Sequence, residues 1–169
     1  MDKLEKLNIG GTWKLECFRN GNKLWEEGFH NTWTAEGLNH LLNVYFHDTT
    51  PVATWYCLIF ESDTTPGDGT TYATPVFTEC TAYTETARPV YNESAASGKK
   101  VTNVDNKAVF TMNASKTIYG AALVSVSTKG DTIGGGILPV ADRFRSSRAV
   151  VSGDVLNLTY EVSCQDAGV

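Results

Sequence analysis

RAVVSGDVLNLTYEVS, residues 148–163, is the most informative stretch of this 169-residue chain. It combines β-branched and aromatic residues with a Ser-Gly-Asp interruption at 152–154. The former favour strands, and a Gly-Asp dipeptide favours a tight connection between two strands. Its main apolar residues are Val155, Leu158, Tyr160 and Val162, and their positions do not follow one strict period. The stretch therefore predicts two tightly joined strands that close a sheet.

A second pair of strands is predicted upstream, near the start of the sequence. Trp13, Leu15 and Cys17 alternate with other residues over 11–19, which is the period of a half-buried strand. Asn20-Gly21-Asn22 tolerates positive φ and predicts a hairpin turn. We expect the chain to return as the second strand over 23–29.

Residues 1–10 precede this hairpin and are predicted to form an N-terminal arm. Leu4, Leu7 and Ile9 stand there among charged residues. The pattern fits one helical turn, and it fits equally an extended arm that lies along a neighbouring molecule. We place the boundary of the arm at residue 10 and expect 11–169 to form a single domain.

The period changes from two to a helical spacing after Thr34. Thr34 is a suitable N-cap, and Glu36 follows in the first turn. Apolar residues then recur at three- and four-residue spacing, which predicts a helix over 35–46 with one buried face. The residues of this predicted buried face are Leu38, Leu41, Leu42 and Tyr45. Trp33 is placed to pack back on Leu38 as a hydrophobic staple.

Short strand candidates alternate with turn signals through the rest of the chain. ATWYCLIF, residues 53–60, predicts a strand with both faces covered, and the Pro-, Gly- and Thr-rich residues 62–75 predict a loop. Further strand candidates are 76–80, 83–91, 107–113 and 118–127, with a polar stretch at 92–100 and a glycine turn at 134–136. Such spacing is typical of a sandwich or barrel. We expect a mainly β fold, an antiparallel β-sandwich of jelly-roll or immunoglobulin-like type with one helix near 35–46.

The charge of the chain argues against a nucleic-acid partner. The formal net charge is −5, whereas proteins that bind nucleic acids need clustered Lys and Arg to displace counterions from phosphate. The densest basic stretch holds Arg143, Arg145 and Arg148. We interpret it first as a solvated loop or a salt-bridging rim, and second as a contact with an acidic partner surface.

The cysteines and the apolar runs predict a cytosolic site of folding. Three of the four cysteines lie in apolar, strand-like sequence, and we expect all four to be free thiols: Cys17, Cys57, Cys80 and Cys164. The first residues lack the apolar run of a secretory signal, and no segment approaches the roughly 20 apolar residues that span a bilayer. We therefore expect no membrane association and folding in a reducing cytosol.

No motif of catalysis, cofactor binding or metal binding emerges. His40 and His47 are seven positions apart without the glutamate of a metalloprotease motif, and His30 is interpreted as a hydrogen-bonding residue at a chain corner. The three glycines at 134–136 lack the Lys-Ser/Thr ending of a phosphate-binding loop. The carboxylates are scattered, and no nucleophile elbow is present. We expect a non-enzymatic protein without cofactor.

The tryptophans allow two interpretations. Exposed tryptophans could stack on sugar rings, but Trp13, Trp25 and Trp55 each lie within a strand pattern and are expected in the core. A glycan-binding or glycan-cleaving site would place exposed aromatic side chains beside paired carboxylates in a groove.

Two blocks of the sequence resemble structural proteins of tailed-bacteriophage virions. The first is HNTWTAEGLNHLLNVYF, residues 30–46, followed by ATWYCLIF. The second pairs KAVFTMNASKTIYGAALVS, residues 107–125, with the closing stretch RAVVSGDVLNLTYEVS. In the proteins that the chain resembles, a hairpin, a Gly-Leu-Asn-His helix and a Trp-Tyr strand precede a β-sandwich. The similarity covers most of the chain, although the second block is general to head decoration, tail and fibre modules.

This resemblance implies a non-enzymatic capsid decoration or cement protein that bridges capsid subunits. The alternatives are a tail or fibre-attachment protein and a glycan-binding surface module. The implied partners are the major capsid protein, copies of the chain itself, or both, within an oligomeric assembly in the virion. We expect the arm 1–10 and the loop 61–75 to be contact elements, because neither is well able to order itself. The candidate interface residues are Leu4, Leu7, Ile9, Asp63, Tyr72, Arg143 and Arg145.

Overall fold

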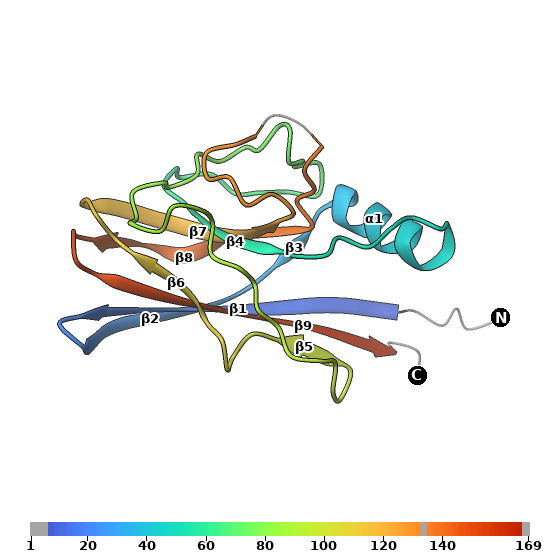
Figure 1. Ribbon diagram of the computed structural model, residues 1–169, viewed down its shortest axis with the longest axis horizontal. Helices are drawn as coiled ribbons and strands as arrows, with labels where there is room; N and C mark the ends of the chain where they lie inside the picture. Colours follow the sequence, from blue (N-terminus) through green and yellow to red (C-terminus); the bar gives the residue numbers. More distant parts are fainter. Residues whose placement is uncertain (1–6, 133–134, 167–169) are drawn as a thin grey trace.

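The structure, a computed structural model, describes residues 7–132 and 135–166. Strands make up 46% of the chain and helix 8%, and two antiparallel sheets pack against each other, consistent with a β-sandwich (Figure 1). The predicted fold class is therefore confirmed. Leu4 and Gly134 lie outside the described residues.

The first sheet is built around the last strand of the chain. β9 (Val155–Asp166) pairs on one side with β1 (Leu7–Arg19), which in turn pairs with β2 (Asn22–His30). On its other side β9 pairs with β5 (Lys100–Thr102) and β6 (Ala108–Thr111). The closing stretch of the sequence thus lies at the centre of this sheet and joins both halves of it.

The second sheet has the order β3-β8-β7-β4. Its strands are β3 (Thr32–Trp33), β8 (Val140–Val150), β7 (Lys116–Val124) and β4 (Tyr56–Phe60). Between β3 and β4 the chain forms α1 (Ala35–Phe46), the helix of the described part of the chain, which projects from one end of the sandwich (Figure 1). The helix predicted for 35–46 is confirmed.

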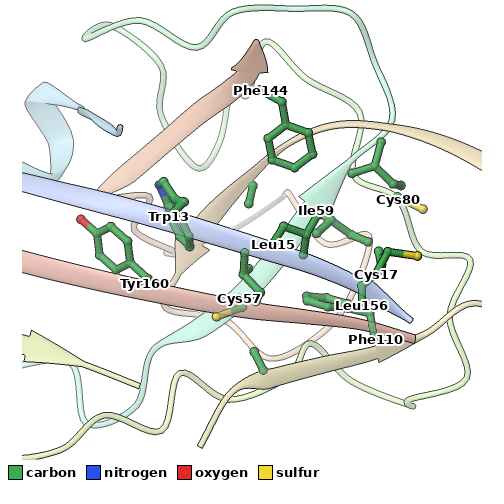
Figure 2. Close-up of a cluster of buried hydrophobic side chains, with 14 of the residues drawn as sticks. Trp13, Leu15, Cys17, Cys57, Ile59, Cys80, Phe110, Phe144, Leu156 and Tyr160 are labelled. Carbon is green, nitrogen blue, oxygen red and sulfur yellow. The ribbon is translucent and has the colours of Figure 1, made fainter. Parts of the chain in front are cut away.

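The main core lies between the two sheets. Alternate residues of β1 point inward, and Trp13, Leu15 and Cys17 are fully buried, as their period predicts (Figure 2). Trp13 stacks on Tyr160 of β9 with 4.1 Å between ring centroids, and Phe29 meets Phe144 edge-on across the sheets at 4.6 Å. Aromatic pairs of this kind add to the free energy gained from burial.

A second apolar cluster covers the face of the second sheet that points away from the main core. Leu58 and Phe60 belong to it, whereas Cys57 and Ile59 point into the main core. The prediction of a strand with both faces covered is confirmed. The covering side chains come largely from irregular segments, among them Tyr72, Phe77 and Leu138.

The hairpin between β1 and β2 is confirmed. Asn20 and Gly21 have φ of 50° and 78°, the left-handed values that an Asn-Gly turn accepts readily. The strand β1 begins at Leu7, however, and Leu7 and Ile9 pair with Asp166 and Cys164 of β9. The prediction of a separate arm is therefore wrong for residues 7–10, because β9 is long enough to extend the pairing beyond Gly11.

The closing stretch contains two tightly joined strands, as predicted, but these strands do not pair with each other. β8 belongs to one sheet and β9 to the other, so the connection around Gly153 crosses the sandwich. The buried apolar side chains of β9 are Leu156, Leu158 and Tyr160, two residues apart, and the polar Thr159 between them is also buried. Val155 lies on the other face, which agrees with the lack of one strict period among Val155, Leu158, Tyr160 and Val162.

Other strand predictions were only partly right. Residues 76–80 and 83–91 contain isolated bridges at Glu79, Tyr83 and Val90 instead of strands. The prediction of a solvated loop for the three arginines is wrong, since all three lie on β8. The salt-bridging alternative fits better: Arg143 pairs with Asp63 and Arg148 with Glu27, each at 2.5 Å.

The cysteines are free thiols, as predicted. Cys17, Cys57 and Cys80 are buried, and Cys164 is half-buried on β9. Across residues 7–132 and 135–166, no helix has the length and apolarity needed to cross a membrane.

Candidate binding site at helix α1

The first turn of α1 is held tightly by the chain around residue 138. The hydroxyl of Thr34 accepts a hydrogen bond from the backbone N–H of Gly37 at 3.0 Å, which confirms Thr34 as the N-cap. The same hydroxyl donates to the carbonyl of Leu138 at 2.5 Å. The carboxylate of Glu36 accepts from the N–H groups of Leu138 and Tyr72 at 2.7 and 3.0 Å. These bonds fix the helix to two distant segments.

The inner face of the helix is not the one predicted. Gly37, His40, Leu41 and Val44, spaced as one helical stripe, face the sandwich and line a pocket. Gly37 rests so close to the backbone of Pro139 that a Cβ would collide with it. Of the predicted buried face, Leu41 lines the pocket but is still 38% exposed. The prediction is wrong for Leu38, Leu42 and Tyr45, because Pro139 and β8 approach from the side of Gly37.

An adjoining side of the helix exposes large apolar residues. The exposed fractions are 39% for Leu38, 54% for Leu42, 79% for Tyr45 and 76% for Phe46. Leu42 follows Leu38 by four positions, and the neighbours Tyr45 and Phe46 follow Leu42 by three and four; we call these four residues the outer helix face. The rings of Tyr45 and Phe46 contact each other edge-on at 4.8 Å between centroids. An exposed apolar cluster on a helix is a common mark of a binding surface.

Between α1 and the open end of the sandwich lies an apolar cavity of about 300 Å³, here called the helix pocket. Its lining comes from the inner stripe of α1, from the segment after the helix, and from both sheets. Besides the helix residues, the lining residues are Trp33, Pro51, Val52, Trp55, Tyr91, Glu93, Val101, Leu123, Pro139, Val140, Tyr160 and Val162. Cavities of this size and composition are typical of sites for small molecules.

Two residues of the lining carry a polar atom without a protein partner. The hydroxyl of Tyr160 and the indole Nε1 of Trp33 are buried and make no hydrogen bond, although both residues line the cavity. Figure 2 shows the Tyr160 hydroxyl directed away from the labelled core side chains. Burial raises the pKa of Tyr160 far above its usual range, so the phenol stays protonated and able to donate.

The chain beside this tyrosine is tightly fitted. A Cβ on Gly11 would collide with both the Tyr160 hydroxyl and the side-chain oxygen of Asn31. The Asn31 amide also has no hydrogen-bond partner on either of its polar atoms. Such buried polar groups ordinarily have partners. Gly11 and Asn31 do not line the helix pocket, so this tightly fitted region is separate from it.

The predicted interface residues do not form one site. Leu7 is exposed at the start of β1, Ile9 is half-buried in the same strand, and Asp63 and Arg143 form an ion pair. Arg145 is exposed on β8. These residues lie on separate elements, and none of them lines the helix pocket.

Tyr72 was wrongly predicted to lie at an interface. It is 2% exposed, and its hydroxyl donates to the carbonyl of Asp131 at 2.8 Å. Arg88 donates to that hydroxyl and pairs with Glu79 at 2.7 Å, so the loop 61–75 is tied down by a buried network of its own chain. The expectation that this loop cannot order itself therefore fails.

The prediction that three of the tryptophans lie in the core is right for one of them. Trp13 is in the core as predicted, whereas Trp25 and Trp55 are only partly buried at its edge. The ring of His40 meets Trp55 edge-on at 5.9 Å. Within the described part of the chain, no group of three His, Cys, Asp or Glu side chains is arranged to hold a metal ion.

Comparison with family models and with curated proteins found no match to this chain. The site must therefore be judged from its own geometry.

Sequence reasoning missed the helix pocket. The only local signal was the stripe Gly37, His40, Leu41 and Val44, which is less apolar than the stripe that includes Leu38 and Leu42. Nothing in the sequence shows that Trp33, Trp55 and Tyr160 converge there, because they come from three different strands or connections.

Proposed function

We propose that the chain is a non-enzymatic structural protein of a tailed-bacteriophage virion, a capsid decoration or cement protein that bridges neighbouring capsid subunits. The proposal rests on the resemblance of residues 30–46 and 53–60, and of residues 107–125 and 148–163, to such proteins. Its partners are the major capsid protein, further copies of the chain, or both. The protein folds in the bacterial cytoplasm and ends in the virion, without a nucleic-acid or membrane partner.

The outer helix face is the observation that best supports an adhesive role. Leu42, Tyr45 and Phe46 are more than half exposed, while the first turn of the helix is anchored by Thr34 and Glu36. A rigidly held apolar surface loses little conformational entropy when a partner covers it. Full burial of each such side chain contributes about 1.5–3 kcal/mol, which accumulates over many copies on a shell.

A partner suited to this surface has an apolar groove that accepts a helix. Helix-in-groove recognition uses anchors at three- and four-residue spacing, which Leu38, Leu42, Tyr45 and Phe46 provide. The charge of −5 predicts that the rim of this groove is neutral or basic rather than acidic.

Two alternatives predict different partners. A tail or fibre-attachment protein would use the same helix face against a tail protein. A glycan-binding module would need exposed aromatic rings beside paired carboxylates, and among the residues that line the helix pocket the carboxylate is Glu93 alone. The geometry therefore favours an apolar protein partner over a sugar.

The test is sedimentation of purified protein with capsids of the encoding phage that lack it. We expect Leu42→Asp combined with Phe46→Asp to weaken binding at least about tenfold, because charged groups cannot be buried in an apolar groove without cost. Val104→Asp is the matched control, since Val104 is similarly exposed, at 50%, in a turn of another region. Its binding should equal that of the unmodified protein.

The same experiment distinguishes the alternatives. Unchanged capsid binding by the double variant would exclude the outer helix face as the contact. Binding to purified tails but not to heads would replace the decoration proposal with the tail alternative.

A further inference from the structure

We propose that the free protein forms a two-fold symmetric dimer, in which the outer helix face of each copy covers an exposed apolar end of the first sheet of the other copy. This inference does not depend on the proposed role in a virion, although it concerns the same face of α1. Its consequence is that the free protein covers its own adhesive surface, so that a capsid must displace the second copy to bind there.

One end of the first sheet extends beyond the second sheet. Figure 1 shows β1 and β9 running past β4, β7 and β8, toward the end of the sandwich where α1 projects. Leu7 and Ile9 continue the alternation that places Trp13 in the core, so their side chains lie on the same face of the sheet as Trp13. Beyond the second sheet, however, Leu7 is 69% exposed and Ile9 is half-buried.

β9 and β5 widen this apolar surface. Cys164 is the partner of Ile9 in the ladder, and Val162 is the partner of Val101. Partners in a ladder share a face of the sheet, and these three side chains of β9 and β5 are each half-buried. We call Leu7, Ile9, Val101, Val162 and Cys164 the sheet end.

The sheet end and the outer helix face lie at the same end of the molecule. Val101 and Val162 line the helix pocket together with the inner stripe of α1, so the sheet end adjoins the helix. Two different apolar patches that lie close together can contact a second copy about a two-fold axis, with each patch covering the other. Such a contact is closed and gives a dimer instead of a filament.

The apolar area favours this crossed contact over a contact between two helices. Tyr45 and Phe46 are more than three-quarters exposed, and with Leu38 and Leu42 they offer about 400 Å² of apolar surface. Two such faces would together bury about 800 Å², less than the roughly 1,000 Å² of a specific interface. Covering both sheet ends as well raises the total to about 1,100 Å².

The crossed contact also buries no charged side chain, because the outer helix face and the sheet end contain none. Each copy has a formal net charge of −5, so two copies repel each other at low ionic strength. Salt screens this repulsion and leaves apolar contacts intact. We therefore expect the dimer to become tighter as salt is added.

The test is sedimentation velocity of the full chain at increasing concentration, where we expect reversible dimers at micromolar concentrations. The helix variant carries Leu42→Asp and Phe46→Asp, and the sheet-end variant carries Leu7→Lys and Ile9→Lys. Each should raise the dissociation constant at least about tenfold, because a charged group is costly to bury. Val109→Lys, at a 40% exposed position of β6, is the matched control and should dimerise like the unmodified chain.

Circular dichroism establishes that each variant is folded. If the sheet-end variant does not fold, Leu7→Lys alone, at the more exposed position, takes its place and should also weaken the dimer.

A mixture of the two variants distinguishes the crossed contact from a contact between helices. In a mixed dimer, the unmodified helix of the sheet-end variant meets the unmodified sheet end of the helix variant. At the other contact, the introduced aspartates meet the introduced lysines and attract them. The mixture should therefore dimerise at least about tenfold more tightly than either variant alone.

Four results would overturn the proposal. A monomer at every concentration would exclude self-association, and species larger than a dimer would exclude the two-fold arrangement. Dimers of the sheet-end variant as tight as those of the unmodified chain would exclude the sheet end. A mixture no tighter than its components would exclude the crossed contact.

Capsid sedimentation separates this proposal from the proposed function. The sheet-end variant keeps its outer helix face, so it should bind capsids at least as tightly as the unmodified chain. A chain that binds capsids but never dimerises would remove only the dimer, and a chain that dimerises but never binds capsids would remove only the capsid role.

Discussion

The guanidinium of Arg19 donates two hydrogen bonds to the carboxylate of Asp154, from Nε at 2.7 Å and from Nη2 at 3.0 Å. Arg19 ends the first strand, and Asp154 ends the connection that crosses from one sheet to the other. The carboxylate also accepts from the backbone N–H of Val151 at 2.9 Å. One buried aspartate therefore holds the crossing in place against the N-terminal hairpin.

This arrangement predicts a pH-dependent contribution to stability. The hydrogen bond from Arg19 lowers the pKa of Asp154, followed by the bond from Val151, against the opposing effect of burial. The contribution should be fully present above the ordinary aspartate pKa of about 3.9, and it should be lost as the pH falls through the lower pKa of the folded state.

Asp154→Asn should therefore destabilise the fold at pH 7 by about 1–3 kcal/mol, measured by urea unfolding. The difference from the unmodified chain should shrink on acidification below pH values of about 4. Asp105→Asn, in an exposed turn, is the control and should change stability by less than about 0.5 kcal/mol. A difference that is constant from neutral to acid pH would contradict the linkage.

Because Leu156 in the closing strand is buried, replacing it with a smaller residue should leave a cavity and lower the free energy of unfolding substantially. Leu156 is fully buried in the main core, opposite Phe110 of β6, so Leu156→Ala should cost about 2–5 kcal/mol in unfolding free energy. Leu42→Ala, by contrast, should stay within about 0.5 kcal/mol because that side chain is largely exposed. A large effect at Leu42 in the purified monomer would show that the helix packs by its other side.

Gly37 should not tolerate a methyl group. In an exposed helix, Gly→Ala usually stabilises by about 0.5–1 kcal/mol. At position 37 the added Cβ would meet the backbone of Pro139, so we expect Gly37→Ala to destabilise by about 1–3 kcal/mol in thermal or urea unfolding. Asn43→Ala, on an exposed position of the same helix, controls for helix propensity and should be neutral or stabilising. A stabilising Gly37→Ala would contradict the close approach.

The thiols should react very unequally. Burial raises the pKa of Cys17 and of Cys80 to about 11, and it raises the pKa of the fully buried Cys57 further. At pH 8 these three should resist iodoacetamide in the folded protein, since the thiolate is the reactive form. Cys164, half-buried on β9, should be labelled first.

Mass spectrometry of alkylated peptides measures this order. After denaturation without reductant, all four cysteines should be labelled, because none is in a disulfide. Rapid labelling of Cys57 in the folded state, or recovery of a disulfide-linked peptide, would contradict the prediction.

Local features were predictable because their causes lie within a few residues. The period of two at Trp13, Leu15 and Cys17 correctly predicted the inner face of β1, and Asn20-Gly21 correctly predicted the turn. Thr34 and the helical spacing after it correctly predicted where α1 begins and ends. The arginines around Arg145 were misassigned because a half-exposed strand with polar residues resembles a loop in sequence.

The sequence by itself determined a mainly β chain with one early hairpin, one capped helix and two strands near its end, since backbone preference and side-chain period act locally. Only the tertiary structure decided that β8 and β9 belong to opposite sheets, because a short turn permits either a hairpin or a crossing. It also decided which side of α1 is covered. Leu38 and Leu42 are as apolar as Leu41, but Pro139 approaches beside Gly37, where the absence of a side chain admits it. The helix pocket and the exposed outer helix face both follow from that one contact between distant segments.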